Sequence, residues 1–193
     1  ATNTVANSQF EYFFGSTGLE EPVGWHSSGA YVTTGDFPYF SVAGNYIVKL
    51  DSGSQLSQLI PTHSGDSVFS WHTNLTGAGN CYYEFEFFDP DLTRLGAVTS
   101  GEYIPASGDK WNRNYKGFGD TNLHQNQFSV GEHELSGWGY YSPPEKAKFM
   151  QAKLTFEGAG QLNIDAVQYE LLADMQPYNR NFRFDELTVE YET

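Results

Sequence analysis

The chain has 193 residues, a net charge of −14 and a pI near 4.5. A nucleic-acid-binding protein needs a basic stripe to neutralise phosphates, so this charge argues against nucleic acid and also against anionic lipid. Neutral sugars and cations remain compatible partners. No segment approaches the roughly 20 consecutive apolar residues that span a bilayer, so membrane insertion is not expected.

The composition predicts an all-β chain. Aromatic residues make up 17% of it and there are 20 glycines, and these residues favour strands and tight turns respectively. A chain of this length can bury one core, so we expect a single domain over 1–193. The lone cysteine, Cys81, excludes an intramolecular disulfide and lies in the strand-like run "CYYEFEFF". We interpret it as a small buried side chain rather than a catalytic thiol.

In chain order, short apolar runs separated by turn residues predict a series of strands. The predicted strands cover residues 9–14, 39–51, 54–61, 64–75, 81–89, 148–158, 161–172 and 182–192. Sustained 3.6-residue periodicity is absent, so any helix is expected to be short. The spacing is typical of a β-sandwich built from two antiparallel sheets.

Several of these strands alternate with a period of two. In 64–75, Phe69 and Trp71 lie on one face and His72 on the other, and 81–89 and 148–158 alternate in the same way. Side chains of a strand point to opposite faces of the sheet in turn. The pattern therefore predicts sheets with one face in the core and the other in water.

The segment 99–142 differs from the rest of the chain. It is rich in Gly, Asn, Tyr and Trp and has only short apolar runs. Long ordered loops in compact domains tend to carry function, so we interpret it as a loop insertion with a binding role. A disordered insertion is the alternative.

Signatures of enzymes are mostly absent. The chain has no G-x-S-x-G elbow, P-loop, dinucleotide fingerprint or H-E-x-x-H pair. Glu84 and Glu86 lie on the same face of one predicted strand, with Cβ atoms about 6–7 Å apart. Glycosidases use two carboxyl groups that flank the scissile bond, usually from separate strands. We therefore expect no catalysis, and a lyase or glycosidase that uses either glutamate is the competing hypothesis.

Aromatic and polar residues on the outward faces predict a sugar-binding surface, because flat rings stack on sugar C–H faces and polar neighbours bind the hydroxyls. If their strands are neighbours, these side chains form a common floor: His72, Tyr82, Glu84, Glu86, Phe88, Gln151 and Lys153. Trp111 and Tyr115 would overhang this floor from the segment 99–142. Trp25 is a further candidate, and core packing is the alternative for each aromatic residue.

The order of the motifs resembles a known family. The chain contains "NSQFE" followed by "GW", then "AGNYIVKLDSGSQLSQLIP", "SGDSVFSWHTN", "YYEFEFFDPDLTRLG" and "PPEKAKFMQAKLTFEGAGQLNIDAVQYE". This order, over about residues 7–172, is similar to the jelly-roll carbohydrate-binding modules of families 4, 9, 16 and 22. The resemblance implies a β-sandwich jelly roll and non-catalytic binding of a polysaccharide or oligosaccharide.

The resemblance also implies a structural calcium ion. The carboxylates that match the family pattern are Glu11, of "QFE", and Asp165, of "NIDAV". Calcium prefers carboxylate and carbonyl oxygens, and an ion between these two residues would join the two ends of the sandwich. A hydrogen-bonding role for Asp165 and a solvated position for Glu11 are the alternatives.

The tail "LLADMQPYNRNFRFDELTVEYET" extends beyond the family pattern. Together with "DAVQYE" it is similar to modules of phage tail and baseplate proteins that bind host cell-wall saccharides. The lone cysteine suits such a virion component and equally a module of a secreted hydrolase. We therefore expect an extracellular or virion-surface adhesion or targeting domain of a larger protein. The competing hypothesis is a structural domain for protein–protein contact in a virion or cell-surface assembly.

Overall fold

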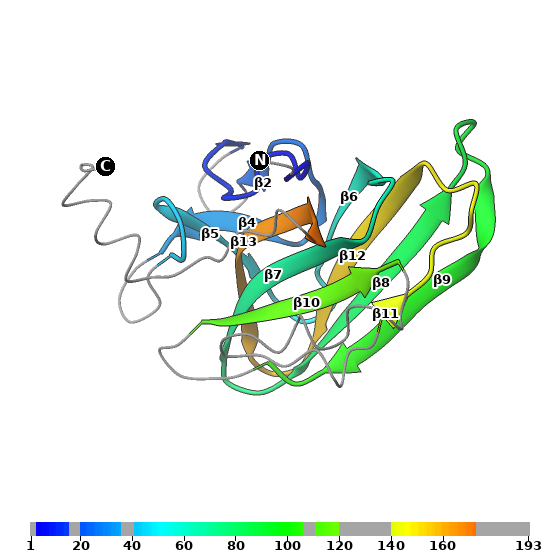
Figure 1. The fold of residues 1–193 in the computed structure, drawn as a ribbon. Helices are drawn as coiled ribbons and strands as arrows, with labels where there is room; N and C mark the ends of the chain where they lie inside the picture. The colour runs from blue at the N-terminus through cyan, green and yellow to red at the C-terminus, as the bar shows by residue number, and fades with distance from the viewer. Residues whose placement is uncertain (1–2, 16–19, 36–40, 106–110, 120–139, 173–193) are drawn as a thin grey trace.

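A computed structural model describes residues 3–15, 20–35, 41–105, 111–119 and 140–172. These residues form two stacked β-sheets and a short two-stranded ribbon (Figure 1). One sheet has six strands in the order β11-β10-β7-β13-β5-β4, and the other has five in the order β3-β6-β12-β8-β9. All neighbouring strands in the sheets run antiparallel except β10 and β11, which are parallel. The predicted all-β sandwich is confirmed.

The strands have the following bounds: β1 Phe13–Phe14, β2 Glu21–Pro22, β3 His26–Ser28, β4 Tyr31–Thr34, β5 Tyr46–Leu50, β6 Gln55–Pro61, β7 Ser67–Thr76, β8 Asn80–Phe88, β9 Arg94–Tyr103, β10 Asn112–Phe118, β11 Tyr140–Tyr141, β12 Phe149–Glu157 and β13 Gln161–Leu171. The sequence pattern located β5, β6, β7, β8, β12 and β13 to within a few residues at their C-terminal ends. It missed β2, β3, β4, β9, β10 and β11. The predicted strand at 182–192 lies outside the described residues.

The core fills the space between the two sheets. Inward-facing residues of β7, β8 and β12 are almost fully buried, and the largest with under 2% exposure are Trp71, Phe69, Phe85, Phe87 and Phe156. Trp71 packs against Phe85, with ring centroids 6.3 Å apart, and its indole N–H donates to the Tyr103 hydroxyl at 2.8 Å. The period-two pattern therefore identified the inner faces correctly.

The same pattern was wrong about the outer face of the six-stranded sheet. Ser70, His72 and Asn74, which alternate with the core residues of β7, are only 1%, 4% and 0% exposed. Asp165 and Glu170 on β13 are buried as well. The polar residues at every second position therefore do share one face of the sheet, but that face is buried and not exposed to water.

The segment 99–142 is not one long loop. It contains the end of β9 and the whole of β10 and β11. β10 pairs with β7 over seven residues, from Asn112 opposite Thr73 to Phe118 opposite Ser67. The loop prediction is therefore wrong for 112–118, where polar side chains conceal a buried strand. Residues 106–110 and 120–139 lie outside the described part of the chain.

The N-terminal segment lies along β13, close to the C-terminal end of the described chain (Figure 1). The Thr4 amide donates to the Tyr169 carbonyl oxygen at 3.1 Å, and the Val167 amide donates to the Ser8 carbonyl oxygen at 2.9 Å. Residues 9–12 do not continue as the predicted strand, because Phe10 has a φ of 56° and turns the backbone. This turn presents Glu11 to the loop before β5.

Candidate functional site

The outer face of the five-stranded sheet brings together most of the predicted sugar-binding residues. β8 and β12 are neighbours, and their register places Gln151 opposite Glu86, Lys153 opposite Glu84 and Thr155 opposite Tyr82. The structure therefore brings together on one face Tyr82, Glu84, Glu86, Phe88, Gln151 and Lys153, and their role in sugar binding stays a prediction. These residues are all partly exposed. We call this surface the β8–β12 face.

Ion pairs run across this face. The Lys153 ammonium lies 3.2 Å from a carboxylate oxygen of Glu84, and both side chains are about one third or more exposed. Glu86 pairs with Arg94, which follows the turn from β8 into β9. Pairs of this kind in water contribute little to stability, so a polar ligand can compete at small cost for these partly exposed carboxylates.

One end of the β8–β12 face is hollowed. The hollow has a volume of about 470 Å³. It is lined by Gln55, Tyr82, Tyr83, Glu84, Ser100, Gly101, Glu102, Lys153, Thr155 and Glu157. We call it the sheet-face hollow. Its lining offers hydroxyl, amide, carboxylate and ammonium groups around an aromatic residue, which is the mixture that sugar recognition needs.

Tyr82 and Glu102 lie directly opposite each other on β8 and β9. Their side-chain hydrogen bond raises the pKa of the Tyr82 phenol, whereas a hydrogen bond with Asn80 lowers it. The Tyr82 hydroxyl is thus held beside a carboxylate at the rim of the hollow. Sequence reasoning missed Glu102 because β9 was not predicted as a strand, and only the register with β8 reveals it.

Four of the predicted residues do not lie on this face: His72, Trp111, Tyr115 and Trp25, the last of which is described below. His72 is on β7 and Tyr115 is on β10, and both strands belong to the six-stranded sheet. Trp111 immediately precedes β10, and it is only 4% exposed. The expected positions are therefore wrong: His72 does not share the floor, and Trp111 and Tyr115 do not overhang it.

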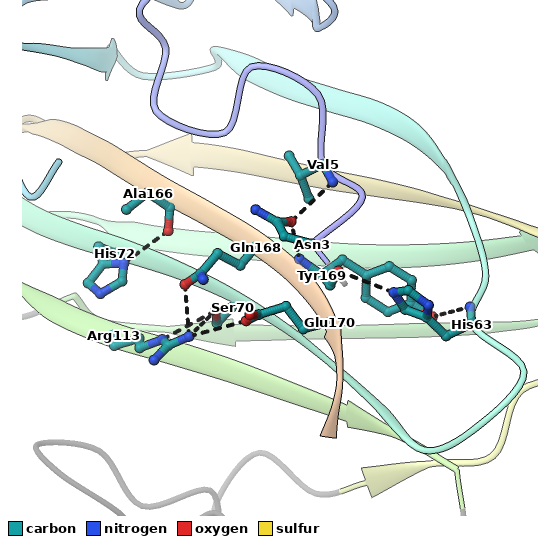
Figure 2. Close-up of polar contacts among 10 residues, drawn as sticks. All are labelled: Asn3, Val5, His63, Ser70, His72, Arg113, Ala166, Gln168, Tyr169 and Glu170. Carbon is teal, nitrogen blue, oxygen red and sulfur yellow. Dashed lines mark hydrogen bonds and ion pairs between the residues drawn. The ribbon is translucent and has the colours of Figure 1, made fainter. Parts of the chain in front are cut away.

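Instead, the outer face of the six-stranded sheet carries a buried charged cluster centred on Arg113 (Figure 2). The Arg113 guanidinium donates to Gln168 Oε1 at 2.8 Å and to Ser70 Oγ at 3.1 Å. It lies 3.6 Å from a carboxylate oxygen of Glu170 and 5.1 Å from the centre of the Tyr115 ring. Both charged side chains are under a tenth exposed. We call these residues the Arg113 cluster.

His72 lies beside the Arg113 cluster but makes a separate contact. Burial lowers the pKa of its imidazole to about 3, and the charge of Arg113 adds to this. The ring is therefore neutral at physiological pH, and its Nδ1–H donates to the Ala166 carbonyl oxygen at 3.0 Å. This bond supports a bulge in β13, where the register with β7 shifts between Asp165 and Gln168.

Trp25 is a core residue. It is 8% exposed, and its ring packs against Phe10 with centroids 5.4 Å apart. Its indole N–H donates to the Asn7 carbonyl oxygen at 3.3 Å. Cys81 is also buried, and burial raises the pKa of its thiol to about 12. The prediction that Cys81 is a small buried side chain is confirmed, whereas Trp25 has no exposed ring to offer a ligand.

Glu11 and Asp165 both bind the loop at 41–46. Asp165 Oδ2 accepts the amides of Val42 and Ala43 at 2.7 and 3.0 Å. Glu11 Oε2 accepts the amides of Asn45 and Tyr46, each at 3.0 Å. The two carboxylates thus bind neighbouring parts of one short loop, although they are far apart in sequence.

The backbone beside each carboxylate is unusual. Phe10 and Ala166, which flank Glu11 and Asp165, have φ values of 56° and 48°. Non-glycine residues rarely adopt this conformation, and it concentrates at functional sites. Gly44, which lies in sequence between the amides that bind Asp165 and those that bind Glu11, has a φ of 66°, and a Cβ there would overlap the Glu11 carboxylate.

The charge at Asp165 is poorly compensated. Burial raises the pKa of its carboxyl group well above the ordinary value, and the charge of Glu11 adds to this, although three backbone amides oppose it. A cation between the two carboxylates would relieve both effects, so these residues fit a calcium ion in donor type and charge. Among the described residues no three His, Cys, Asp or Glu side chains group around one point. A calcium ion here would therefore need backbone carbonyl or water oxygens as further ligands.

No protein-family model and no curated protein matches the chain. Solved structures do match its fold. The carbohydrate-binding module TmCBM61, in complex with β-1,4-galactotriose, has a TM-score of 0.56 and 16% identity, over 88% of this chain and 98% of that one. The CBM22-1 xylan-binding domain from Paenibacillus barcinonensis has a TM-score of 0.50 and 13% identity, over 89% of this chain and 96% of that one.

A bacteriophage protein also matches. The enzymatically active domain of Bacteriophage CBA120 tailspike protein 4 has a TM-score of 0.54 and 16% identity, and the match covers 88% of this chain but only 21% of that one. None of the described residues forms a helix long and apolar enough to cross a membrane. At these identities the comparisons establish architecture. The chain therefore has the jelly-roll β-sandwich fold of carbohydrate-binding modules.

Proposed function

We propose that the protein is a non-catalytic carbohydrate-binding module that binds a polysaccharide or oligosaccharide at the β8–β12 face. The observation that carries the proposal is the sheet-face hollow, an open site of about 470 Å³ with Tyr82, Glu84, Glu102 and Lys153 in its lining. Ligand sites commonly have volumes of about 300–1,000 Å³ and a few convergent polar groups. The shared fold with modules that bind galactotriose and xylan supports the same conclusion.

Each group in the hollow has a defined task. Tyr82 offers an aromatic surface, and its hydroxyl is oriented by Glu102. The carboxylates of Glu84 and Glu102 accept hydrogen bonds from sugar hydroxyls, and the Lys153 ammonium donates to sugar oxygens. Charged groups form hydrogen bonds about twice as strong as neutral ones. Gln151, Glu86 and Phe88 extend the face beyond the hollow, along β12 and β8.

The arrangement of carboxylates favours binding without hydrolysis. Glu84 and Glu86 are on one strand and each pairs with a cationic side chain, Lys153 and Arg94 respectively. A glycosidase instead places a protonated acid and a base or nucleophile on either side of the glycosidic bond. We expect saccharide binding with no release of sugar from any polysaccharide.

Binding and turnover measurements test the function together. The chain is screened against plant polysaccharides and bacterial cell-wall saccharides, and reducing ends are assayed after prolonged incubation. Selective binding that weakens at least tenfold in Tyr82→Ala and Glu102→Gln, with both variants folded, supports the proposal. Glu20→Gln, distant in sequence from the hollow and absent from its lining, is the matched control.

Turnover that disappears in Glu84→Gln would replace the module by an enzyme. Absence of binding to every glycan would instead favour a structural protein–protein contact domain, the alternative function. An exposed group of aromatic residues on the β1–β2 ribbon and its approach favours that alternative, because Tyr12 is 70% exposed and Phe14 is 57% exposed. Apolar patches of this kind often mark protein contacts.

We also propose that the module acts in adhesion or targeting within a larger extracellular or virion protein. The match to one fifth of a phage tailspike chain supports a modular context of this kind. Phage and secreted-enzyme origins make different predictions for the ligand. Preference for bacterial cell-wall saccharides supports the phage context, whereas preference for plant polysaccharides supports a secreted hydrolase.

Finally, we propose that Glu11 and Asp165 hold a structural calcium ion. When bound, the ion would supply positive charge between two carboxylates that otherwise repel each other. The residues of this chain would orient the site: backbone amides of the loop at 41–46 fix one oxygen of each carboxylate, and His72 fixes the Ala166 carbonyl. Calcium titration followed by calorimetry, and by melting with and without EDTA, tests this proposal.

A further inference from the structure

A second hollow lies at one end of the sandwich. It has a volume of about 520 Å³. Its lining comes from three places: the loop between β6 and β7, residues 143–148 before β12, and the facing ends of β10 and β13. The lining residues are Thr62, His63, Ser64, Gly65, Asp66, Ser67, Phe118, Gly119, Pro143, Pro144, Glu145, Ala147, Lys148 and Tyr169. We call it the end hollow.

The end hollow is separate from the sheet-face hollow. Both touch strand β12 or its approach, but Lys148 lines the end hollow and Thr155 lines the sheet-face hollow. The nearest residue of this strand that lines the sheet-face hollow is Lys153, five residues of extended chain from Lys148, which corresponds to about 17 Å. The two hollows share no lining residue.

The base of the end hollow contains two buried hydroxyl groups. Ser67 and Tyr169 are each 1% exposed, and their hydroxyl oxygens lie 2.9 Å apart. The Tyr169 hydroxyl oxygen also accepts the His63 amide at 3.2 Å. The His63 ring packs on the Tyr169 ring, with centroids 4.7 Å apart (Figure 2). The base is therefore ordered by mutual contacts.

The Ser67–Tyr169 pair has one more hydroxyl proton than it has acceptors within the pair. Each hydroxyl has one proton to donate. One of the two hydroxyls donates to the other, so the second proton needs an acceptor outside the pair. Within the described part of the chain neither hydroxyl makes any other hydrogen bond. A buried donor without an acceptor costs about 1–3 kcal/mol, so this proton must be donated to an oxygen of water or of a molecule bound in the end hollow.

The rim of the end hollow supplies the other kinds of group that bind a sugar. Asp66 and Glu145 supply carboxylate acceptors, and Lys148 supplies an ammonium donor. Pro143 and Pro144 supply half-buried apolar walls. A sugar ring offers the matching groups, because each hydroxyl both accepts and donates and the C–H edges are apolar.

From these contacts we infer that the end hollow is a second saccharide-binding site, which takes one or two neutral sugar units through a hydroxyl or acetamide oxygen placed on the Ser67–Tyr169 pair. The site rests on its own lining and does not require that the β8–β12 face binds sugar. The end hollow is less open than the sheet-face hollow, so it should favour short ligands or chain ends, whereas the sheet face can accept the interior of a chain.

Amide chemical-shift mapping on the full chain tests the inference. The labelled protein is titrated with galactose, xylose, N-acetylglucosamine and their β-1,4-linked oligosaccharides. We expect saturable shifts at Ser67, Glu145 and Lys148 with at least one of these sugars. A double variant, His63→Ala with Glu145→Ala, should weaken this response at least tenfold while the response at Tyr82 and Glu102 is unchanged.

Two controls separate this inference from the proposed function. Glu102→Gln should weaken only the response at the sheet face, and Tyr169→Phe should abolish only the response at the end hollow. If Tyr169→Phe unfolds, the rim double variant decides. Shifts confined to the β8–β12 face overturn the second site and leave the proposed function intact. Shifts confined to the end hollow support the second site and overturn the proposed function. If no sugar causes any shift, both are overturned.

Discussion

The two outer sheet faces carry polar residues in the same alternating pattern but in opposite environments. On the β8–β12 face, Lys153 and Glu84 pair while both remain about one third or more exposed. On the six-stranded sheet, Arg113 and Glu170 pair while each is under a tenth exposed. Pairs in water are worth little to stability, whereas a buried charge must keep its partner. The comparison indicates that one face is available for ligands and the other is structural.

The largest expected effect tests this contrast directly. Glu170→Ala leaves the Arg113 guanidinium buried without its carboxylate, so we expect a loss of about 3–5 kcal/mol in the free energy of unfolding. Glu84→Ala, the matched control on the exposed face, should cost less than about 1 kcal/mol. Urea denaturation measures both.

A double replacement sharpens the test. Arg113→Met combined with Glu170→Leu removes both charges and should recover most of the stability lost in Glu170→Ala. Equal losses for Glu170→Ala and Glu84→Ala would contradict the distinction between the two faces.

The sequence predicted the inner faces well and the outer faces poorly, for a physical reason. Burial of Trp71 and Phe85 follows from their own hydrophobicity and parity. Burial of Arg113 does not, because a charged residue in a strand usually indicates solvent. The sequence "NRNYKGF" was therefore interpreted as part of a loop, although it forms β10 and its neighbour β7 supplies the partners.

The candidate site was predictable only in part. Alternation along one strand grouped Tyr82, Glu84 and Glu86, and the facing strand added Gln151 and Lys153. Which strands are neighbours is a non-local property, so His72 was assigned to the wrong sheet and Glu102 was missed. The pairing of Glu11 with Asp165 came from the family resemblance, and the structure brings both to one loop.

Calcium provides the next largest effect. At a free concentration of about 100 times the dissociation constant, a ligand that binds only the folded state adds about 2.7 kcal/mol. We therefore expect calcium to raise the melting temperature and EDTA to reverse the rise. Asp165→Asn removes the charge that attracts the ion and should abolish the response. A calcium response that persists in Asp165→Asn with Glu11→Gln would place the ion elsewhere.

Gly44→Ala tests the same site through the backbone. Gly44 has a φ of 66°, and a Cβ there would overlap the Glu11 carboxylate. The left-handed conformation alone costs a non-glycine residue about 1–2 kcal/mol, and displacement of Glu11 should also weaken calcium binding. Gly53→Ala, at a φ of 84° with open space around it, controls for the backbone cost alone. Equal calcium affinity in the two variants would separate Glu11 from the metal.

Cys81, a core residue of β8, extends the comparison from the outer faces to the interior. Burial raises the pKa of the Cys81 thiol from 9.0 to about 12. The unfolded chain then loses this proton at lower pH than the folded chain, so stability is fully present below pH 9 and falls as pH rises from 9 towards 12. At pH 10 the loss from this group should be about 1.4 kcal/mol. Cys81→Ala should reduce the alkaline slope of the unfolding free energy, and an unchanged slope would contradict the buried, neutral thiol.

The smallest effect on stability should accompany a clear effect on binding. Glu84→Gln keeps the shape of the side chain and removes the charge that pairs with Lys153, so the free energy of unfolding should change by less than about 1 kcal/mol. A hydrogen bond to a charged group contributes about 1.5–3 kcal/mol when it is not replaced by water, so saccharide affinity should fall roughly tenfold or more. Calorimetry and denaturation on the same sample separate the two quantities. If Glu84→Gln weakened folding as much as Glu170→Ala does, both faces would be structural, and the exposure of the β8–β12 face would no longer identify it as the binding surface.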